Sequence, residues 1–228
     1  MIKMEDVYKT YANGVTALNG VNIEIDQGEF VYIVGPSGAG KSTFIKLMYR
    51  EVKPTTGKIV INNKDMSELK EKEVPFLRRN IGVIFQDFKL LPRLSVYENI
   101  AFALEVIEES PRNIRKRVMD VLEQVGLKNK ARFIPDELSG GEQQRVSVAR
   151  AIVNHPKVVI ADEPTGNLDP ETSWGIMRLF EEINASGTTI IMATHSKEIV
   201  NTIKKRVIAV EDGLIVRDEH RGEYGYEI

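Results

Sequence analysis

Residues 35–43 read GPSGAGKST, and this stretch constrains the fold more than any other part of the chain. It satisfies the pattern G-x-x-x-x-G-K-[ST] directly after the apolar run FVYIV and before the helical pattern TFIKLM. Its glycines let successive backbone N–H groups converge on a phosphate, and the following helix adds its positive end. Lys41 would reach the β- and γ-phosphates, and the Ser42 hydroxyl would reach Mg²⁺. The alternative is a glycine turn that matches the pattern by chance, and average residue usage gives such a match in roughly one in a hundred chains of this length. The stretch therefore predicts a nucleotide site between a strand and a helix.

Two kinds of strand pattern are present. VNIEID (21–26) and GKIVINN (57–63) alternate apolar and polar residues, which is typical of strands with one buried face. Nearly continuous apolar runs instead predict strands covered on both faces. These runs are 30–34, 158–161, 189–193 and 207–210. We expect the second group to form the parallel centre of an α/β sheet, and the first an antiparallel edge or subdomain.

Between these strands the sequence predicts helices. Ser95 and Glu98 form a capping box ahead of YENIAFALEVI. Ser110 and Pro111 begin a second helix that ends at Gly126. This helical segment runs from about Asp87 to Pro135. The basic run at 112–117 in it is interpreted as a solvated face in preference to a patch for a membrane or partner.

A second chemical element is VVIADEP (158–164), an apolar strand that ends in two carboxylates. Such a strand end is costly unless a cation meets it. Asp162 is placed to hold Mg²⁺ directly or through water, and Glu163 to accept a proton from an attacking water. The alternative is a helix cap or an ion pair, which the phosphate-binding stretch on the same chain makes less favourable.

The stretch LSGGEQQ (138–144) also delivers the chain into a helix whose exposed amides could bind an anion. One nucleotide does not need two such loops.

Composition narrows the choice of function further. The net charge of −2 argues against nucleic-acid binding, and the absence of cysteine excludes thiolate chemistry. No apolar segment is long enough to cross a bilayer, so a role at a membrane would need another chain as the anchor.

With these motifs in order, the chain resembles the nucleotide-binding subunit of ATP-binding-cassette (ABC) systems. Tyr11 matches the aromatic residue that stacks on adenine, and Gln86, after IGVIF, matches the glutamine that senses Mg²⁺ and water. LSGGE matches the family signature, Asp169 in GNLD the loop beside the partner's site, and His195 the switch histidine. Each has a simpler explanation: a core or surface tyrosine, an exposed glutamine, a structural histidine.

The resemblance implies an α/β fold: a P-loop NTPase (ABC ATPase) core with a mostly parallel sheet, an antiparallel β subdomain and an inserted α-helical subdomain. The core would comprise 1–86 and 156–228, and the helical subdomain about 87–155. ATP and Mg²⁺ are the implied cofactors. The implied catalytic residues are Lys41, Gln86, Glu163 and His195, and the implied metal ligands are Ser42, Gln86 and Asp162. The implied nucleotide contacts are Tyr11, Gly35, Pro36, Ser37, Gly38, Ala39, Gly40, Lys41, Ser42, Thr43, Ser139, Gly140, Gly141, Glu142 and Asp169.

The family pattern also implies a homodimer in which two copies pack head to tail. The LSGGE loop of one copy would then close over the nucleotide held by the other, so a single chain holds two half-sites. Within the family, YREVKPTTG, ADEPTGNLDP and GEYGYE look closest to the cell-division ATP-binding proteins of Gram-positive bacteria. That likeness implies an integral membrane partner of FtsX type, an indirect link to peptidoglycan hydrolases, and a place on the cytoplasmic face of the membrane. An ATPase of lipoprotein release or macrolide export, and an ABC ATPase acting on ribosomes or DNA, remain alternatives.

Overall fold

The structure is a computed structural model and describes residues 2–225. Its strands are β1 (Ile2–Thr10), β2 (Thr16–Ile25), β3 (Phe30–Val34), β4 (Thr56–Ile61), β5 (Lys64–Asp65), β6 (Ile81–Phe85), β7 (Val158–Asp162), β8 (Thr189–Ala193), β9 (Arg206–Glu211) and β10 (Leu214–Glu219). Its helices are α1 (Lys41–Met48), α2 (Val74–Arg78), α3 (Val96–Glu105), α4 (Pro111–Gln124), α5 (Gly140–Ile152), α6 (Pro170–Ala185) and α7 (Lys197–Thr202). Short 3₁₀ turns lie at η1 (Glu71–Glu73), η2 (Lys128–Lys130) and η3 (Pro135–Glu137).

The larger sheet has the strand order β10-β9-β3-β8-β7-β6. The strands from β9 to β6 run parallel to their neighbours, and only β10 is antiparallel, to β9. Every residue of β3 and β8 is buried, as their continuous apolar sequences predict. In a parallel sheet the carboxyl ends of the strands meet at one edge, where α/β proteins bind ligands. The expected mostly parallel centre is therefore confirmed.

The smaller sheet is antiparallel and has the order β2-β1-β4-β5. The sequence patterns predict β2 and β4, but β1 was missed. Ile2, Met4 and Val7 of β1 are buried, yet the strand register shifts between Met4 and Val7, and Asp6 has φ of 47°. This irregularity breaks the period-two alternation on which strand prediction depends.

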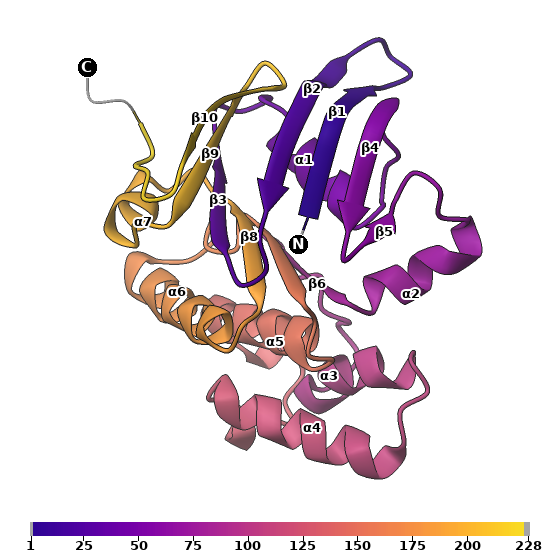
Figure 1. Ribbon diagram of the computed structural model, residues 1–228. Helices are drawn as coiled ribbons and strands as arrows, with labels where there is room; N and C mark the ends of the chain where they lie inside the picture. The colour runs from indigo at the N-terminus through magenta and orange to yellow at the C-terminus, as the bar shows by residue number, and fades with distance from the viewer. Residues whose placement is uncertain (1, 226–228) are drawn as a thin grey trace.

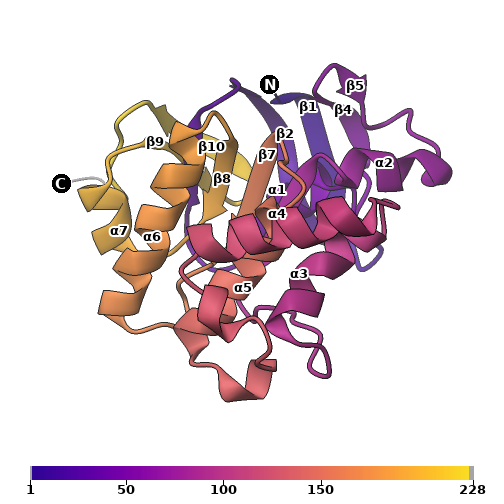
Figure 2. The ribbon, with the colours of Figure 1, turned by 90° about the horizontal axis from the view of Figure 1, so that it is seen from below.

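The elements form layers around two hydrophobic clusters (Figure 1). One cluster lies between the antiparallel sheet, α1 and one face of the parallel sheet, and includes Ile2, Phe44 and Ile160. The other lies between the opposite face and the helices α3 to α6, and includes Tyr32, Val118 and Phe180. In Figure 2, the view from below, α4 runs across the front of the molecule, and it packs against α3 and α5. This architecture confirms the expected α/β class with an antiparallel β part and inserted helices.

The predicted helical segment forms as expected at its helix ends. Glu98 N–H donates to Ser95 Oγ at 3.2 Å, and Ser95 N–H donates to Glu98 Oε2 at 2.7 Å, which completes the capping box. Asn99 is fully buried, and its amide binds backbone groups of Leu91, Leu94 and Ser95. This amide fixes the loop that enters α3. Helix α5 packs against both α3 and β6, so it contacts the helical part and the parallel sheet alike. The domain boundaries at 87 and 155 therefore stay a prediction.

The segment after β10 is docked on α7 as far as the structure describes it. Asn201 Oδ1 accepts the N–H of Tyr224 at 2.8 Å, and Arg217 Nη2 donates to the carbonyl of Glu223 at 2.6 Å. Lys204 pairs with Glu223 at 2.8 Å. Within residues 2–225, none of the helices is both long and apolar enough to cross a membrane.

Candidate functional site

The phosphate loop, residues 35–43, leaves the carboxyl end of β3 and enters α1. Gly35, Gly38 and Gly40 all have positive φ, at 144°, 80° and 109°. A Cβ on Gly35 would lie 2.0 Å from the carbonyl oxygen of Val210, and one on Gly40 would lie 2.3 Å from that of Ala17. Only glycine fits these two positions, because both backbone conformation and space exclude a side chain.

Lys41, at the start of α1, folds back over the phosphate loop. Its ammonium donates to the carbonyls of Gly35 and Pro36 at 2.8 and 2.9 Å. The amino end of α1 receives no side-chain cap, since Gly40 occupies the cap position. Free N–H groups at this end and the helix dipole both favour an anion. Tyr11 lies beside the same turn, where its hydroxyl is 3.1 Å from Thr43 Oγ1, so the expected adenine contact and the phosphate loop are neighbours.

Asp162 and Glu163 lie at the carboxyl end of β7, as predicted. Burial raises the pKa of Asp162, while the Ser42 hydroxyl and the charges of Lys46 and Lys41 act against this shift. The structure therefore brings Asp162, Ser42 and Lys41 together. Glu163 has φ of 51°, in the left-handed region that costs a non-glycine residue about 1 kcal/mol. Backbone strain of this kind concentrates at functional positions.

His195 follows β8 and contacts Glu163 directly. Its Nδ1 is 2.7 Å from Glu163 Oε2, and its backbone N–H donates to the same oxygen at 3.2 Å. Glu163 Oε1 takes no hydrogen bond from any described residue. The His195 side chain is 66% exposed and that of Glu163 is 18% exposed, so the histidine covers the carboxylate from the solvent side. A cavity of about 300 Å³ adjoins both residues.

Gln86 lies at the same sheet edge, because Phe85 of β6 pairs in register with Asp162 of β7. Its Nε2 donates to Asn167 Oδ1 at 3.2 Å, and Asn167 Nδ2 donates to the Gln86 carbonyl at 3.1 Å. This two-way contact ties Gln86 to the loop that follows Glu163. Gln86 is exposed to solvent.

The signature loop, residues 138–142, starts α5 with a second capping box. Glu142 N–H donates to Ser139 Oγ at 3.3 Å, and Ser139 N–H donates to Glu142 Oε2 at 2.9 Å. That backbone bond is the main reason that the pKa of Glu142 lies below its usual value. Lys130 pairs with the other oxygen, Oε1, at 3.2 Å. The loop thus presents a helix amino end whose capping carboxylate is already paired.

Asp169 caps the neighbouring helix α6. It accepts the N–H and the hydroxyl of Thr172 at 2.9 and 2.6 Å, and these bonds lower its pKa. The amino ends of α5 and α6 lie side by side, since a Cβ on Gly141 would be 2.3 Å from Thr172 Cγ2. An open cavity of about 610 Å³ lies between them and is lined in part by Ser139, Gly141 and Thr172. The described residues show no hydrogen bond or ion pair between this cluster and the phosphate loop.

The sequence profile of the ABC transporter family matches residues 18–166, which is more than half of the chain. The chain belongs to the ABC transporter family. It is accordingly an ATP-binding cassette that hydrolyses ATP.

Curated relatives match this ABC cassette over nearly its whole length. It is 71% identical over 225 residues to the cell division ATP-binding protein FtsE of Bacillus subtilis, covering 99% of each chain. It is 63% identical to the protein of the same name from Streptococcus pneumoniae strain D39, covering 100% of this chain and 99% of the relative. Among solved structures, it is similar to an ATP-binding cassette in a dimeric, post-hydrolysis state bound to ADP and Pi. That comparison has a TM-score of 0.88 and 38% identity, and covers 99% of this chain and 100% of the other.

The residues expected to hold Mg²⁺ suit a cation that arrives with phosphate oxygens. Asp162 is a carboxylate whose ionised form is disfavoured by burial, so a cation beside it would relieve that cost. Within residues 2–225, no group of three or more His, Cys, Asp or Glu side chains could hold a metal by itself. Mg²⁺ commonly binds through one or two protein groups plus substrate phosphates. The set Ser42, Gln86 and Asp162 fits that mode.

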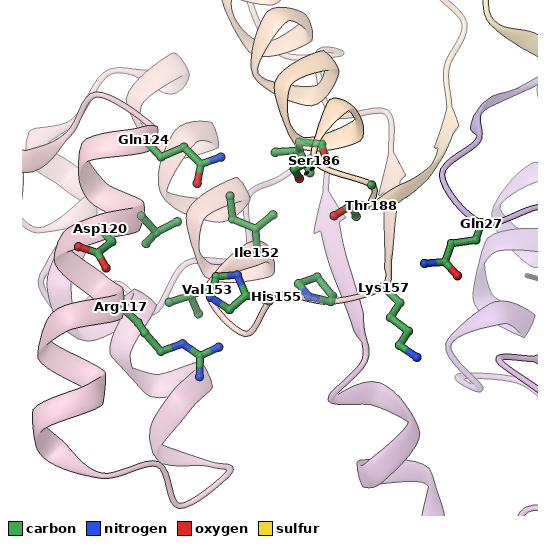
Figure 3. Close-up of a pocket in the computed structure, with 14 residues that line it drawn as sticks. Gln27, Arg117, Asp120, Gln124, Ile152, Val153, His155, Lys157, Ser186 and Thr188 are labelled. Carbon is green, nitrogen blue, oxygen red and sulfur yellow. Dashed lines mark hydrogen bonds between the residues drawn. The ribbon is translucent and has the colours of Figure 1, made fainter.

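A separate cavity of about 440 Å³ lies at the opposite, amino-terminal edge of the parallel sheet. Figure 3 shows Arg117, Asp120 and Gln124 of α4 facing His155 and Lys157 across it. Lys157 precedes β7 and Thr188 precedes β8, so both mark the amino ends of their strands. None of the predicted site residues lines this cavity.

Sequence reasoning missed several side chains that hold the site in place. Gln144 is fully buried and its Nε2 donates to the Pro164 carbonyl at 2.6 Å, which joins α5 to the loop bearing Glu163. Asn167 supports Gln86, and Lys130 supports Glu142. These contacts join positions 12 to 81 residues apart, and no local pattern announces them.

Proposed function

We propose that this ABC ATPase is the ATP-hydrolysing subunit of an FtsEX-type cell-division complex. In that role it drives conformational change in an integral membrane partner of FtsX type, and so regulates peptidoglycan hydrolysis from the cytoplasmic face of the membrane. The names of relatives that are 49% to 71% identical over almost the full length support this assignment. The alternatives, a lipoprotein-release or macrolide-export ATPase and an ABC ATPase acting on ribosomes or DNA, have no such support among these relatives.

The observation that carries the catalytic proposal is the Glu163 carboxylate at the strand edge that also bears the phosphate loop. His195 holds Oε2, whereas Oε1 accepts no hydrogen bond from the described residues. We therefore assign Oε1 as the atom that takes the proton from a water attacking the γ-phosphorus in line. Fixing one oxygen leaves the other in a defined direction, which lowers the entropic cost of reaction.

The surrounding residues orient the nucleotide and balance its charge. Lys41 moves from the carbonyls of Gly35 and Pro36 to the phosphates, and the backbone N–H groups of residues 35–43 surround the phosphate chain. Tyr11 stacks on adenine. Ser42, Asp162 and Gln86 would hold Mg²⁺, which would supply positive charge to the phosphate oxygens. Asn167 keeps Gln86 directed toward this edge.

We propose that two copies assemble head to tail around two ATP molecules. The absence of bonds between signature loop and phosphate loop among the described residues supports an arrangement in which each completes a site with the other copy. Ser139, Gly140, Gly141 and Asp169 then face the γ-phosphate held by Lys41 of the second copy. ADP lacks that phosphate, so hydrolysis removes the charge that joins the copies and the dimer opens.

An apolar cavity of about 510 Å³ is the site we propose for the membrane partner. It is lined by Phe102, Val106 and Ile107 of the α3 region, together with Arg79 and Gly82. Phe102 and Val106 are 46% and 59% exposed, which is unusual for large apolar side chains that lie together. The cavity adjoins β6, whose end carries Gln86, so movement there can reach the catalytic edge.

Purification from native membranes tests this assignment. We expect the tagged chain to recover one abundant integral membrane protein with four predicted spans and a large external loop. Val106→Asp should abolish that recovery because it places a charge in the apolar cavity, whereas Val15→Asp, at a position 55% exposed elsewhere, should not. Recovery with ribosomes, or with a substrate-export permease, would contradict the proposal.

A further inference from the structure

Glu142 of the signature loop carries its negative charge at the amino end of α5. Its Oε2 accepts the Ser139 N–H at 2.9 Å, and its side chain is 28% exposed. In the proposed dimer this helix end meets the γ-phosphate of the nucleotide on the second copy. A carboxylate and a phosphate at one helix end repel each other, and the repulsion is strong where water is partly excluded. Something must therefore offset the charge of Glu142 before closure.

Lys130 forms an ion pair with this carboxylate. Its Nζ is 3.2 Å from Glu142 Oε1, and its side chain is also only 28% exposed. The position of Lys130 is fixed by the fold, because its N–H donates to the Leu127 carbonyl at 2.9 Å. Its ammonium also lies 4.6 Å from the centre of the Phe133 ring. This pair is better shielded than the Lys128–Glu123 pair nearby, whose side chains are 56% and 68% exposed.

We propose that Lys130 is a positioning residue for ATP-driven closure: it neutralises Glu142 so that the signature loop can accept the γ-phosphate held by the second copy. The inference rests on the proposed head-to-tail dimer. Without Lys130, the Glu142 carboxylate would lose its ion pair, and its charge at the helix end would oppose the incoming phosphate. With a neutral glutamine at position 142, no such charge exists and Lys130 has nothing to offset.

If Lys130 only supported the fold, its substitution would have a different effect. The Phe133 carbonyl accepts the Val96 N–H at 2.8 Å, so the segment 128–134 also anchors the start of α3. Loss of the Lys130 contact with Phe133 would weaken that anchor whatever residue stands at position 142. Dependence on the charge at position 142 therefore separates positioning of the signature loop from support of the fold.

The test measures the ATP concentration that half-saturates dimer formation, by sedimentation velocity with Mg²⁺, in a Glu163→Gln background. We expect Lys130→Met to raise this concentration about tenfold. When Lys130→Met is combined with Glu142→Gln, the half-saturating ATP concentration should differ less than about twofold from that of Glu142→Gln alone. Lys128→Met is the matched control and should leave it unchanged. Lys130→Arg retains the charge and should stay close to the parental concentration.

Each outcome decides the inference. An equal shift for Lys130→Met with glutamate and with glutamine at position 142 overturns it in favour of a structural role, and so does no shift with glutamate. Thermal unfolding of each variant shows whether it is folded. If Lys130→Met does not fold, the half-saturating ATP concentration of Lys130→Arg is measured in its place. Failure of the Glu163→Gln parent to dimerise would instead contradict the head-to-tail assembly itself, so the two failures are distinguishable.

Discussion

Glu163 Oε2 lies 2.7 Å from Nδ1 of His195 and also accepts the backbone N–H of that histidine. Two strands of the parallel sheet are required for this contact, because Glu163 follows β7 and His195 follows β8. Asp162 pairs in register with Ala193, so Glu163 and His195 both leave their strands at the same edge of the sheet. The proposed base is therefore oriented by backbone and side chain of a single neighbour.

Glu163→Gln should slow ATP hydrolysis by about 10²- to 10⁴-fold, because the amide cannot accept the proton of the attacking water. ATP binding should remain near the parental level, since the phosphate loop is untouched. Steady-state phosphate release and equilibrium nucleotide binding measure the two effects separately. His195→Ala should lower turnover as well, and the double variant should be little slower than Glu163→Gln alone if the pair acts as a unit. Hydrolysis by Glu163→Gln at near the parental rate would show that another group is the base.

The phosphate-loop glycines should differ in their tolerance of a methyl group. Gly40→Ala should lower the free energy of unfolding by about 2 kcal/mol or more, since strained φ adds to a backbone clash with Ala17. Gly38 is the matched control, because its φ is also positive but a Cβ there meets nothing within 4 Å. Gly38→Ala should cost about 1 kcal/mol, from φ alone. Chemical denaturation measures both, and equal losses would contradict the close approach at Gly40.

The raised pKa of Asp162 predicts a conflict between stability and activity. A carboxyl group whose pKa is higher in the folded state is destabilising once ionised. The cost begins as pH rises through the unfolded value, about 3.9, and is complete above the folded value. Asp162→Asn should therefore raise the thermal unfolding midpoint of the nucleotide-free protein at pH 7, and the gain should fade toward pH 4. ATP hydrolysis by this variant should be lost. A lower midpoint at pH 7 would contradict the burial penalty.

Mixing two inactive variants tests which chain supplies each half of a site. Lys41→Ala removes the phosphate contact, and Gly140→Asp places a carboxylate in the signature loop at a position where a Cβ has room, 3.5 Å from Leu168. A mixed head-to-tail dimer retains one intact site, so an equimolar mixture should regain about a quarter of parental activity if the sites act independently. Lys41→Ala mixed with Glu163→Gln is the control, because both changes affect the same half-site and no recovery is expected. Absence of recovery in mixtures shown to contain mixed dimers would contradict the shared site.

The sequence alone predicts the elements whose signals are local. The phosphate loop is recognisable because its glycines, lysine and serine are contiguous, and β3, β7 and β8 are recognisable because their apolar runs are unbroken. The capping box at Ser95 likewise needs only four residues. These elements appear in the structure where they were expected, whereas the capping box at Ser139 was found only in the structure.

The remaining features depend on contacts between distant segments. β1 was missed because the irregularity near Asp6 interrupts its alternation, and β10 because its three apolar residues, 214–216, are followed directly by three charged ones and neither alternate nor form a longer apolar run. Asn167 holds Gln86 by a hydrogen bond between residues 81 positions apart in the sequence. The buried Gln144 holds the Pro164 carbonyl across 20 positions. Such pairs are set by the register of the sheet and the docking of α5, which no window of sequence reports.

The most direct test of the account is the mass of the Glu163→Gln protein in solution, measured by sedimentation equilibrium with Mg²⁺ and either ATP or ADP. We predict a species of twice the chain mass with ATP and a single chain with ADP, because only the γ-phosphate joins the phosphate loop of one copy to the signature loop of the other. A protein that remains a single chain at saturating ATP, alone and with its membrane partner, would contradict the account.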